Sequence, residues 1–373
     1  MQTEQARRYE LTLFSDIDGT LVHYRDQLDA SVKVEPDLED RGRVNLIYDT
    51  VPRTVVPCRV LPTLTSGCGY LSERTVALID ALRAHSVFVA LLTGARSSTL
   101  YRRLSLLPQV DAIAWENGGR LVWRAESAYV EDRGWAHLLE QWTGPHPFYP
   151  SDESLVSSNA TKKKAAGVPS SDTEPADASA IDAPLWRAAT QLSTSGWVLD
   201  TRAYHTAFRV DVAASLQRGG MEWCRNAGES SDGTRHDPLS EQTIDCAAKE
   251  IRAQVTPLGL QMALNLGKAD VFPLCSGKRN VAEYILSTIG GCRKQTVALV
   301  DDDNDLELAK WCGAAYLPNI SSPSVQAEIA RHPEWTLSAH RGPLATEEAL
   351  TALLEQVQAE SGKASQADRS RES

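Results

Sequence analysis

Two aspartates spaced two positions apart, Asp16 and Asp18, are the first residues whose types and spacing could do chemistry. They directly follow Leu11–Ser15, an apolar run typical of a buried strand, and Gly19 behind them permits a tight turn. Side chains at positions i and i+2 of an extended segment point to the same side, so both carboxylates leave the strand end together. Crowding two acids is costly unless they share a cation or a proton. The pair therefore indicates acid–base or metal chemistry, with an acidic turn after an edge strand as the alternative.

A second acidic cluster follows another apolar run. The segment Asp301–Asp305 contains four aspartates around Asn304 and comes directly after Val297–Val300. An acidic helix start is one interpretation, because carboxylates suit the positive end of a helix dipole. Four acids in five residues exceed what helix capping needs. Carboxylate oxygens are ligands that a hard cation such as Mg²⁺ prefers, so the cluster predicts a cation site.

Two further segments could bind an anion. Thr93 and Gly94 follow the apolar run Val87–Leu92, and a hydroxyl beside exposed backbone N–H groups can cradle phosphate oxygens. Lys278 opens a predicted helix, where a cation is electrostatically out of place unless a phosphate lies nearby. The alternatives are an ordinary strand-to-helix turn and a solvated lysine.

The elements that must position these residues alternate along the chain. Apolar runs predict buried strands, and helical patterns between them end at glycine stop signals. The strands are expected at Leu11–Ser15, Val87–Leu92, Asp111–Trp115, Val297–Val300 and Ala314–Leu317, and the helices at about Ser72–His85, Lys278–Ile289 and Asn304–Cys312. Strands alternating with helices favour a doubly wound parallel sheet, an α/β fold that places its ligands at the carboxyl ends of the strands.

The residue pattern in the middle of the chain differs from that of the flanking parts and predicts an inserted α+β cap at about 126–267. An alternating strand pair is expected at Trp197–Val212, a helix around Glu241–Gln254 and a strand at Leu258–Leu266. The stretch at about 151–182 is poor in large apolar residues, which predicts a disordered insertion, and Asn226–Pro238 predicts a second polar loop. The core is then expected at 1–125 and 268–356, followed by a polar tail at 357–373.

The overall composition and net charge limit the classes of molecule that the protein is expected to bind. With 42% hydrophobic and 23% charged residues, the chain is typical of a soluble globular protein. Its net charge of −11 argues against nucleic acid and anionic membranes and for a small molecule. The N-terminus lacks the apolar stretch of a signal peptide, and the seven cysteines contain no C-x-x-C pair. A reducing, cytoplasmic location is therefore expected. The sequence leaves the oligomeric state open.

Taken together, the four elements resemble the four motifs of the haloacid dehalogenase superfamily. The resemblance covers about 11–125 and 268–320 and is carried by Asp16-Ile17-Asp18-Gly19-Thr20, Thr93, Lys278 and the acidic cluster. The return segment Asp270–Leu286 and the turn Glu116–Gly119 are similar to those of the large-cap sucrose-phosphate phosphatase and Cof-type sugar phosphatase group. The resemblance implies a Rossmann-like core with an inserted cap and a Mg²⁺-dependent phosphatase acting on a sugar phosphate.

The resemblance also implies a role for each motif residue. Asp16 would attack phosphorus, and Asp18 would act as general acid and then general base. Mg²⁺ would bind the Asp16 carboxylate, the Asp18 backbone carbonyl and Asp301. Thr93, Gly94 and Lys278 would bind the phosphoryl oxygens. Asp305 and Asn304 would orient the metal shell and Lys278. In the cap, Tyr204, His205 and Arg209 could face the leaving group, although an ordinary sheet-surface position is the simpler interpretation of His205.

The sequence departs from the family pattern at three places. The family's usual glycine before the first acid of the last motif is Val300 here. Asp302 and Asp303 stand where small residues are common, which could raise metal affinity or disturb phosphate approach. The segment at about 22–70 is longer than the pattern requires and predicts an extended flap. Asp18 disfavours a dehalogenase, since halide loss needs no acid at that position, and the cap position disfavours a phosphomutase. A catalytically silent sugar-phosphate-binding or interaction protein with the same fold is the alternative from another class.

Overall fold

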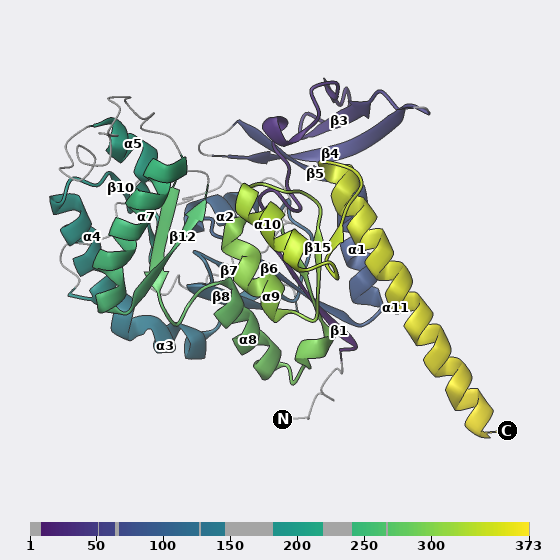
Figure 1. Ribbon diagram of the computed structural model, residues 1–373. Coiled ribbons are helices and arrows are strands. Elements are labelled where there is room, and N and C mark those ends of the chain that lie inside the picture. Colours follow the sequence, from purple (N-terminus) through teal and green to yellow (C-terminus); the bar gives the residue numbers. More distant parts are fainter. Residues whose placement is uncertain are drawn as a thin grey trace, which may run out of the picture. The chain divides into compact units, whose positions relative to one another are not determined.

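The chain forms two compact units (Figure 1). The computed structural model describes residues 9–50, 52–63, 67–126, 128–145, 182–218, 241–265 and 268–372. Unit 1 holds Met1–Thr93, Tyr101–Ile113 and Ala282–Ser373, and unit 2 holds Gly94–Leu100 and Ala114–Val281.

Unit 1 is built on a parallel sheet whose strands follow the order β16-β15-β14-β1-β6-β7. The bounds are β1 Leu11–Ser15, β6 Val87–Leu92, β7 Ala112–Trp115 (which crosses into unit 2), β14 Thr296–Leu299, β15 Ala314–Leu317 and β16 Thr336–Leu337. Strand β1 pairs in parallel with both β6 and β14, and all six residues of β6 are buried. A strand buried on both faces needs the continuous apolar run that the sequence shows there. The predicted parallel α/β core is confirmed.

Helices flank this sheet at the positions that the periodicity predicted. Helix α1 (Glu73–Ala84) contacts β6, and α9 (Leu306–Trp311) contacts β14 and β15. Ser72 caps α1, because its Oγ accepts hydrogen bonds from the backbone N–H groups of Arg74 and Thr75 at 3.1 and 3.4 Å. The remaining elements are α2 (Ser97–Arg103), α8 (Lys278–Thr288), α10 (Pro323–Arg331) and the 3-10 turns η1 (Arg25–Gln27), η5 (Arg293–Gln295) and η6 (Asp303–Asp305).

The segment expected to be an extended flap is a four-stranded antiparallel sheet. Its strands are β2 (Lys33–Pro36), β3 (Arg43–Tyr48), β4 (Thr54–Pro62) and β5 (Cys68–Ser72), in that spatial order. The sheet has its own apolar cluster, made of Leu28, Val32, Leu46, Tyr48, Val56 and Cys58. We call β2–β5 the flap sheet. Because it buries side chains of its own, it can hold a defined shape and serve as a support.

A long helix, α11 (Pro343–Glu372), fixes the loop after β1 through its first turn. It includes the segment that the sequence suggests as a polar tail. The Thr346 hydroxyl donates a hydrogen bond to the Thr20 carbonyl at 2.5 Å and lies 2.9 Å from Nε2 of His23. Since that hydroxyl has one proton, Nε2 of His23 must be the donor to Thr346. His23 is fully buried, and its Nδ1 has no hydrogen-bond partner among the described residues.

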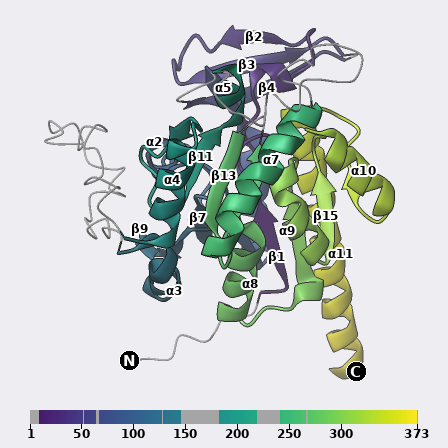
Figure 2. The same cartoon turned by 60° about the vertical axis from the view of Figure 1, so that its left-hand side comes forward.

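Unit 2 contains a second antiparallel sheet covered by helices. The sheet order is β10-β11-β13-β12, with bounds Leu199–Asp200, Phe208–Asp211, Lys268–Pro273 and Leu260–Asn265. Helix α7 (Glu241–Val255) contacts both β12 and α4 (Pro184–Thr194), and Figure 2 shows the two helices running along the sheet. Unit 2 also contains β8 (Arg120–Ala125), β9 (Ala128–Glu131), α3 (Arg133–Thr143), η4 (Thr256–Leu258) and α5 (Val212–Gln217). This mixture of antiparallel strands and helices is what an inserted α+β cap requires.

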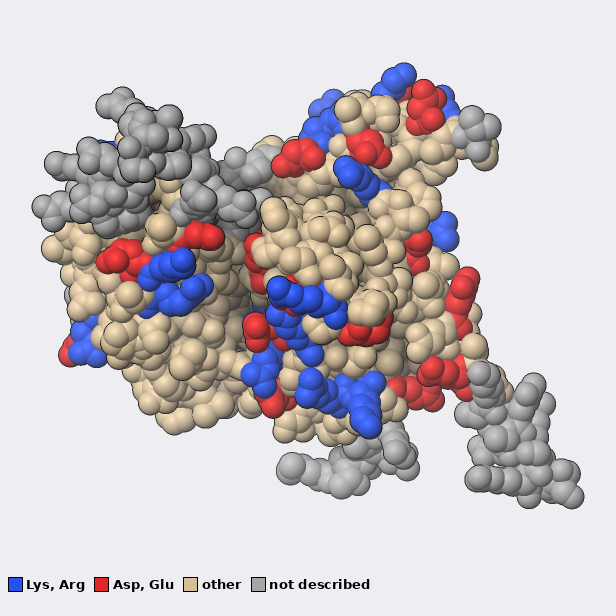
Figure 3. Space-filling view, in the orientation of Figure 1, with Lys and Arg blue, Asp and Glu red and all other residues tan. Residues whose placement is uncertain are grey.

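The boundary between the cap and the core differs from the predicted one, and two predicted loops lie outside the described residues. The sequence places the return to the core at residue 268, whereas β13 pairs within the unit 2 sheet and unit 1 resumes at Ala282. The expected disordered insertion, apart from its last residue, and the loop Asn226–Pro238 lie outside the described residues. None of the described helices has the length and apolar character needed to cross a bilayer. On the face shown in Figure 3, acidic and basic side chains are interspersed over the described surface.

The buried His23 predicts a pH dependence of stability. Burial lowers its pKa to about 3, against a smaller opposing hydrogen bond to the Thr20 backbone. Below about pH 6.5 His23 is therefore protonated in the unfolded chain, whereas in the folded chain it stays neutral down to about pH 3. The free energy of unfolding should fall as the pH is lowered through this window, by at most about 1.4 kcal/mol per pH unit from this residue. Chemical denaturation between pH 7 and 4 should show a shallower slope for His23→Gln than for the unsubstituted protein.

The control for this measurement is His137→Gln, because the His137 side chain is 82% exposed. It should keep the slope of the unsubstituted protein. Equal slopes in all three proteins would show that His23 is not held neutral by the fold.

Candidate active site

The register of the parallel sheet places three of the predicted site residues at neighbouring strand ends. Ser15 of β1 pairs with Leu299 of β14 on one side and with Leu91 of β6 on the other. Asp16 is the next residue after β1, and its N–H donates to the Leu299 carbonyl at 3.0 Å. Asp301 and Thr93 therefore follow the strands on either side of Asp16.

Three carboxylates come together at this edge. Asp16, Asp301 and Asp305 each offer an oxygen, and these oxygens lie within 4.8 Å of one another. The three residues are 4%, 2% and 0% exposed. Burial raises the pKa of Asp301 well above its usual range, and the charges of Asp16 and Asp305 raise it further. A set of buried acidic oxygens that repel one another is what a hard divalent cation fits, so the residues present suit Mg²⁺.

The turn between Asp16 and Asp18 is shaped around Asp301. Gly19 has a φ of +91°, and a Cβ placed on it would lie 2.1 Å from Oδ2 of Asp301. Thr20 donates a hydrogen bond through Oγ1 to Oδ1 of Asp301 at 2.7 Å. The glycine is therefore required both for the left-handed backbone and for the close approach of the second acidic segment.

The Asp18 side chain is held by two residues that sequence analysis did not single out. Arg103, at the end of α2, donates from Nη1 to Oδ1 of Asp18 at 2.6 Å, and the Tyr24 hydroxyl donates to the same oxygen. Arg103 is 3% exposed. The Asp18 side chain is not a member of the three-carboxylate group, and its predicted contribution to the cation is its backbone carbonyl.

The extra acids of the second cluster have partners of their own. Asp303 accepts hydrogen bonds from the hydroxyls of Ser322 and Ser324, both at 2.6 Å. Asp302 accepts from the Ser321 hydroxyl at 3.0 Å, and burial raises its pKa to about 6. Asp302 and Asp303 therefore hold the loop before α10 and the first turn of that helix.

In unit 2 a tight turn sets the start of the helix that carries Lys278. Gly277, directly before Lys278, donates its N–H to the Asn117 carbonyl at 2.8 Å. A Cβ on Gly118 would lie 2.8 Å from the Gly277 carbonyl oxygen, so the Asn117–Gly118 turn needs its glycine. Lys278 is 4% exposed at the first position of α8. A Cβ on Gly94 would lie 3.0 Å from Oδ1 of Asn117, which places Gly94 beside the same turn.

The polar residues suggested for the cap have structural partners. Arg209 forms an ion pair with Asp270 at 2.5 Å, and Asp270 is 1% exposed. Tyr204 is 1% exposed and lies under the guanidinium of Arg96. The backbone N–H of His205 donates to Glu116 at 2.8 Å. The positive charge of Arg209 is therefore neutralised by Asp270, a residue of the same unit.

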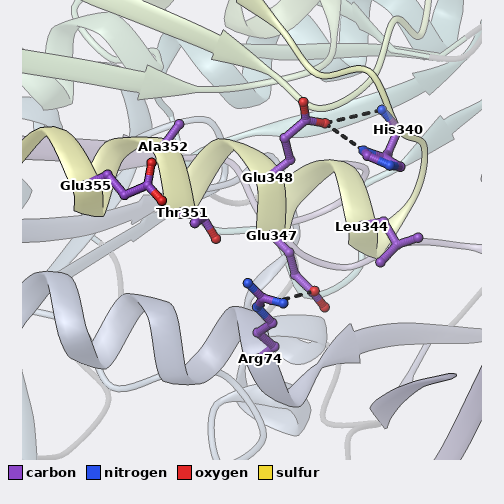
Figure 4. Close-up of a pocket in the computed structure, with 8 residues that line it drawn as sticks. All are labelled: Arg74, His340, Leu344, Glu347, Glu348, Thr351, Ala352 and Glu355. Atoms are coloured by element: carbon purple, nitrogen blue, oxygen red, sulfur yellow. Dashed lines mark hydrogen bonds and ion pairs between the residues drawn. The ribbon is translucent and has the colours of Figure 1, made fainter. Parts of the chain in front are cut away.

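A surface groove of about 390 Å³ lies along α11 and α1 in unit 1 (Figure 4). In the figure Glu347 points toward Arg74, and Glu348 forms a hydrogen bond with His340. None of the predicted site residues lines this groove.

Comparison with known proteins gives matches in structure and none in sequence. Neither a protein-family model nor a curated protein sequence matches the chain. Among solved structures, the sucrose-phosphatase from Synechocystis sp. PCC6803 matches with a TM-score of 0.52 and 15% identity, covering 93% of this chain and 99% of that one. A haloacid dehalogenase-like hydrolase from Bacillus subtilis matches with a TM-score of 0.46 and 12% identity, covering 94% of each chain.

The comparison with the sucrose-phosphatase bears on the fold. It confirms the predicted fold class, a parallel α/β core, and the antiparallel sheet of unit 2 suits an inserted cap. At 15% identity the similarity is one of architecture, so the activity has to be argued from the residues.

The three-carboxylate group predicts that Mg²⁺ stabilises the fold. A cation that binds only the folded chain adds about 2.7 kcal/mol to the free energy of unfolding at 100 times its dissociation constant. Thermal unfolding with and without Mg²⁺, at constant ionic strength, should show a higher melting temperature with Mg²⁺. Asp301→Asn should lose most of this increase.

The matched control is Asp80→Asn, which changes an exposed aspartate of α1 in the same unit. It should keep the full Mg²⁺ effect. An increase of the same size in Asp301→Asn would assign the effect to cations elsewhere on the protein.

Proposed function

We propose that this chain is a Mg²⁺-dependent phosphomonoester hydrolase that works through an aspartyl-phosphate on Asp16. The observation that supports this most directly is the group of buried carboxylates formed by Asp16, Asp301 and Asp305 at the carboxyl edge of the parallel sheet. Buried carboxylates that repel one another lower the stability of a fold. They are useful where a protein has to bind a cation beside a phosphate group.

The residues divide the proposed reaction between them. An Asp16 oxygen attacks phosphorus, the phosphorus–oxygen bond to the leaving group breaks, and Asp18 gives a proton to the departing oxygen. Asp18 then takes a proton from the water that hydrolyses the aspartyl-phosphate, which releases inorganic phosphate and restores the Asp16 carboxylate and the protonated form of Asp18. Thr93, Gly94 and Lys278 would hold the phosphoryl oxygens, and Asn304 would orient Lys278.

The metal would be held by the side chains of Asp16, Asp301 and Asp305 and by the Asp18 backbone carbonyl. When bound, it supplies positive charge that offsets the charge of the phosphoryl group and of the clustered acids. Thr20 orients the Asp301 carboxylate through its 2.7 Å hydrogen bond to Oδ1.

For the substrate we propose a sugar phosphate. The structure with the matching fold contains a sucrose-phosphatase in complex with sucrose and phosphate, which favours the same chemical class here. The core motif residues would contact only the phosphoryl group, so the cap would have to recognise the leaving group. A cytoplasmic location is part of the same proposal and rests on the scattered cysteines.

The nucleophile assignment predicts the result of one isosteric change. Asp16→Asn replaces a single carboxylate oxygen, so the fold should persist while kcat falls by about 10³-fold or more. Release of inorganic phosphate from 4-nitrophenyl phosphate and from a panel of sugar phosphates, each with Mg²⁺, measures this.

Asp80→Asn serves again as the control and should retain full activity. Turnover by Asp16→Asn within tenfold of the unsubstituted protein would remove Asp16 from the mechanism. Binding of sugar phosphates without hydrolysis of any ester would favour the catalytically silent alternative.

The division of labour between core and cap predicts a second contrast. Lys278 would bind the phosphoryl group of every ester, so Lys278→Ala should lower kcat/KM by about 10²-fold for small and large esters alike. His205→Ala should spare 4-nitrophenyl phosphate and penalise the preferred sugar phosphate. Kinetics of both variants on both substrates measure the contrast, and a substrate-selective Lys278→Ala would refute it.

A further inference from the structure

We propose that Arg103 and Tyr24 are positioning residues for Asp18, and that the flap sheet holds both of them in place. The inference deepens the proposed function, because it assumes the acid–base role of Asp18 given above. It concerns unit 1 alone, which contains all the residues involved.

Arg103 uses each of its three guanidinium nitrogens for a different partner. Nη1 donates to Oδ1 of Asp18 at 2.6 Å, Nη2 donates to the Tyr24 hydroxyl at 3.2 Å, and Nε donates to the Pro62 carbonyl at 2.8 Å. Pro62 is the last residue of β4 in the flap sheet. A planar guanidinium can satisfy three fixed directions at once, whereas a lysine ammonium cannot reach all three.

Tyr24 is held against the flap sheet from the other side. The residue before it, His23, exchanges two backbone hydrogen bonds with Tyr70 of β5, at 2.9 and 2.8 Å. Gly69 of β5 leaves room for this segment, since a Cβ there would lie 2.5 Å from Val22 and 3.4 Å from the Tyr24 ring. The Tyr24 hydroxyl, held in this way, donates a hydrogen bond to Oδ1 of Asp18.

Arg103 and Tyr24 both donate to the same oxygen of Asp18, Oδ1. This arrangement indicates that they orient the Asp18 carboxylate and do not only support the fold. The Asp18 side chain is 31% exposed, whereas that of Arg103 is 4% exposed. A partly exposed carboxylate would otherwise be able to rotate about its side-chain torsions. Two donors on Oδ1 fix the orientation of the carboxyl group. An acid–base group is effective only within hydrogen-bond reach of the atom that it serves.

The test compares two esters with leaving groups of different basicity. A basic alkoxide needs protonation by Asp18 as it departs, whereas 4-nitrophenolate hardly does. We expect Arg103→Met and Tyr24→Phe to lower kcat/KM for an alkyl phosphate by about 10²-fold and about tenfold. The loss for 4-nitrophenyl phosphate should be several-fold smaller in each variant, and inhibition by inorganic phosphate should be unchanged. The parameter kcat/KM is chosen because it covers only the steps up to phosphoryl transfer, in which Asp18 acts as the acid.

Two controls separate positioning from general damage. Arg83→Met removes another partly buried arginine, which pairs with Asp111 at 2.7 Å in the same unit. It should lower stability without changing the ratio of the two kcat/KM values. In an Asp18→Asn background, Arg103→Met should cause little further loss, because the residue through which it acts is already disabled. Equal losses for both esters, or losses that multiply in the double variant, would overturn the inference.

A crystal structure of Arg103→Met tests the same inference without any activity. The Asp18 side chain should adopt another rotamer or become disordered while Asp16 and Asp301 keep their places, and an unmoved Asp18 would contradict the proposal. If Arg103→Met does not fold, Tyr24→Phe, which removes one hydroxyl, undergoes the same measurements. Failure of the unsubstituted protein to hydrolyse any ester would refute the proposed function, and the position of Asp18 in the crystal would then decide this inference by itself.

Discussion

The repulsion between three buried carboxylates is the constraint on which the rest of unit 1 depends. At an effective dielectric constant of about 20, two unit charges no more than 4.8 Å apart repel by at least about 3 kcal/mol. Asp16, Asp301 and Asp305 can stay close only because the parallel strands β1 and β14 fix the backbone positions from which they project. Gly19 allows the two acidic segments to approach, and Thr20 offers Asp301 a hydrogen-bond donor.

The supports of this edge come from segments far apart in sequence. The first turn of α11 holds the Thr20 carbonyl, and the last strand of the flap sheet holds the backbone of His23. The loop that carries Asp16 and Asp18 is therefore tied down beyond its own strand on two sides. Such anchoring suits a site in which small displacements of a reacting group are costly.

The sequence was informative where chemistry lies at the end of an apolar run. A buried strand and the residue after it are local features, so the amino-acid pattern alone assigns Asp16, Thr93 and Asp301 to strand ends. Arg103 could not be found in this way, because it is one of two adjacent arginines at the end of an ordinary helix. Its role depends on contacts with Asp18 and Pro62, which lie 85 and 41 positions away. The strands of the flap sheet were missed for a related reason: their partial burial comes from packing within that sheet, and proline and charged residues interrupt the alternation.

The acidic cluster shows how spacing sorts residues of one type into different tasks. From sequence, Asp302 and Asp303 could have strengthened the cation site or hindered the phosphate. The turn η6 instead separates the four acids. Asp301 and Asp305 join Asp16, while serines just before α10 and in its first turn donate to Asp302 and Asp303. Hydroxyl donors take up part of the negative charge without adding a cation. The number of acids in a motif is therefore a weaker guide to metal affinity than the positions from which their side chains can converge.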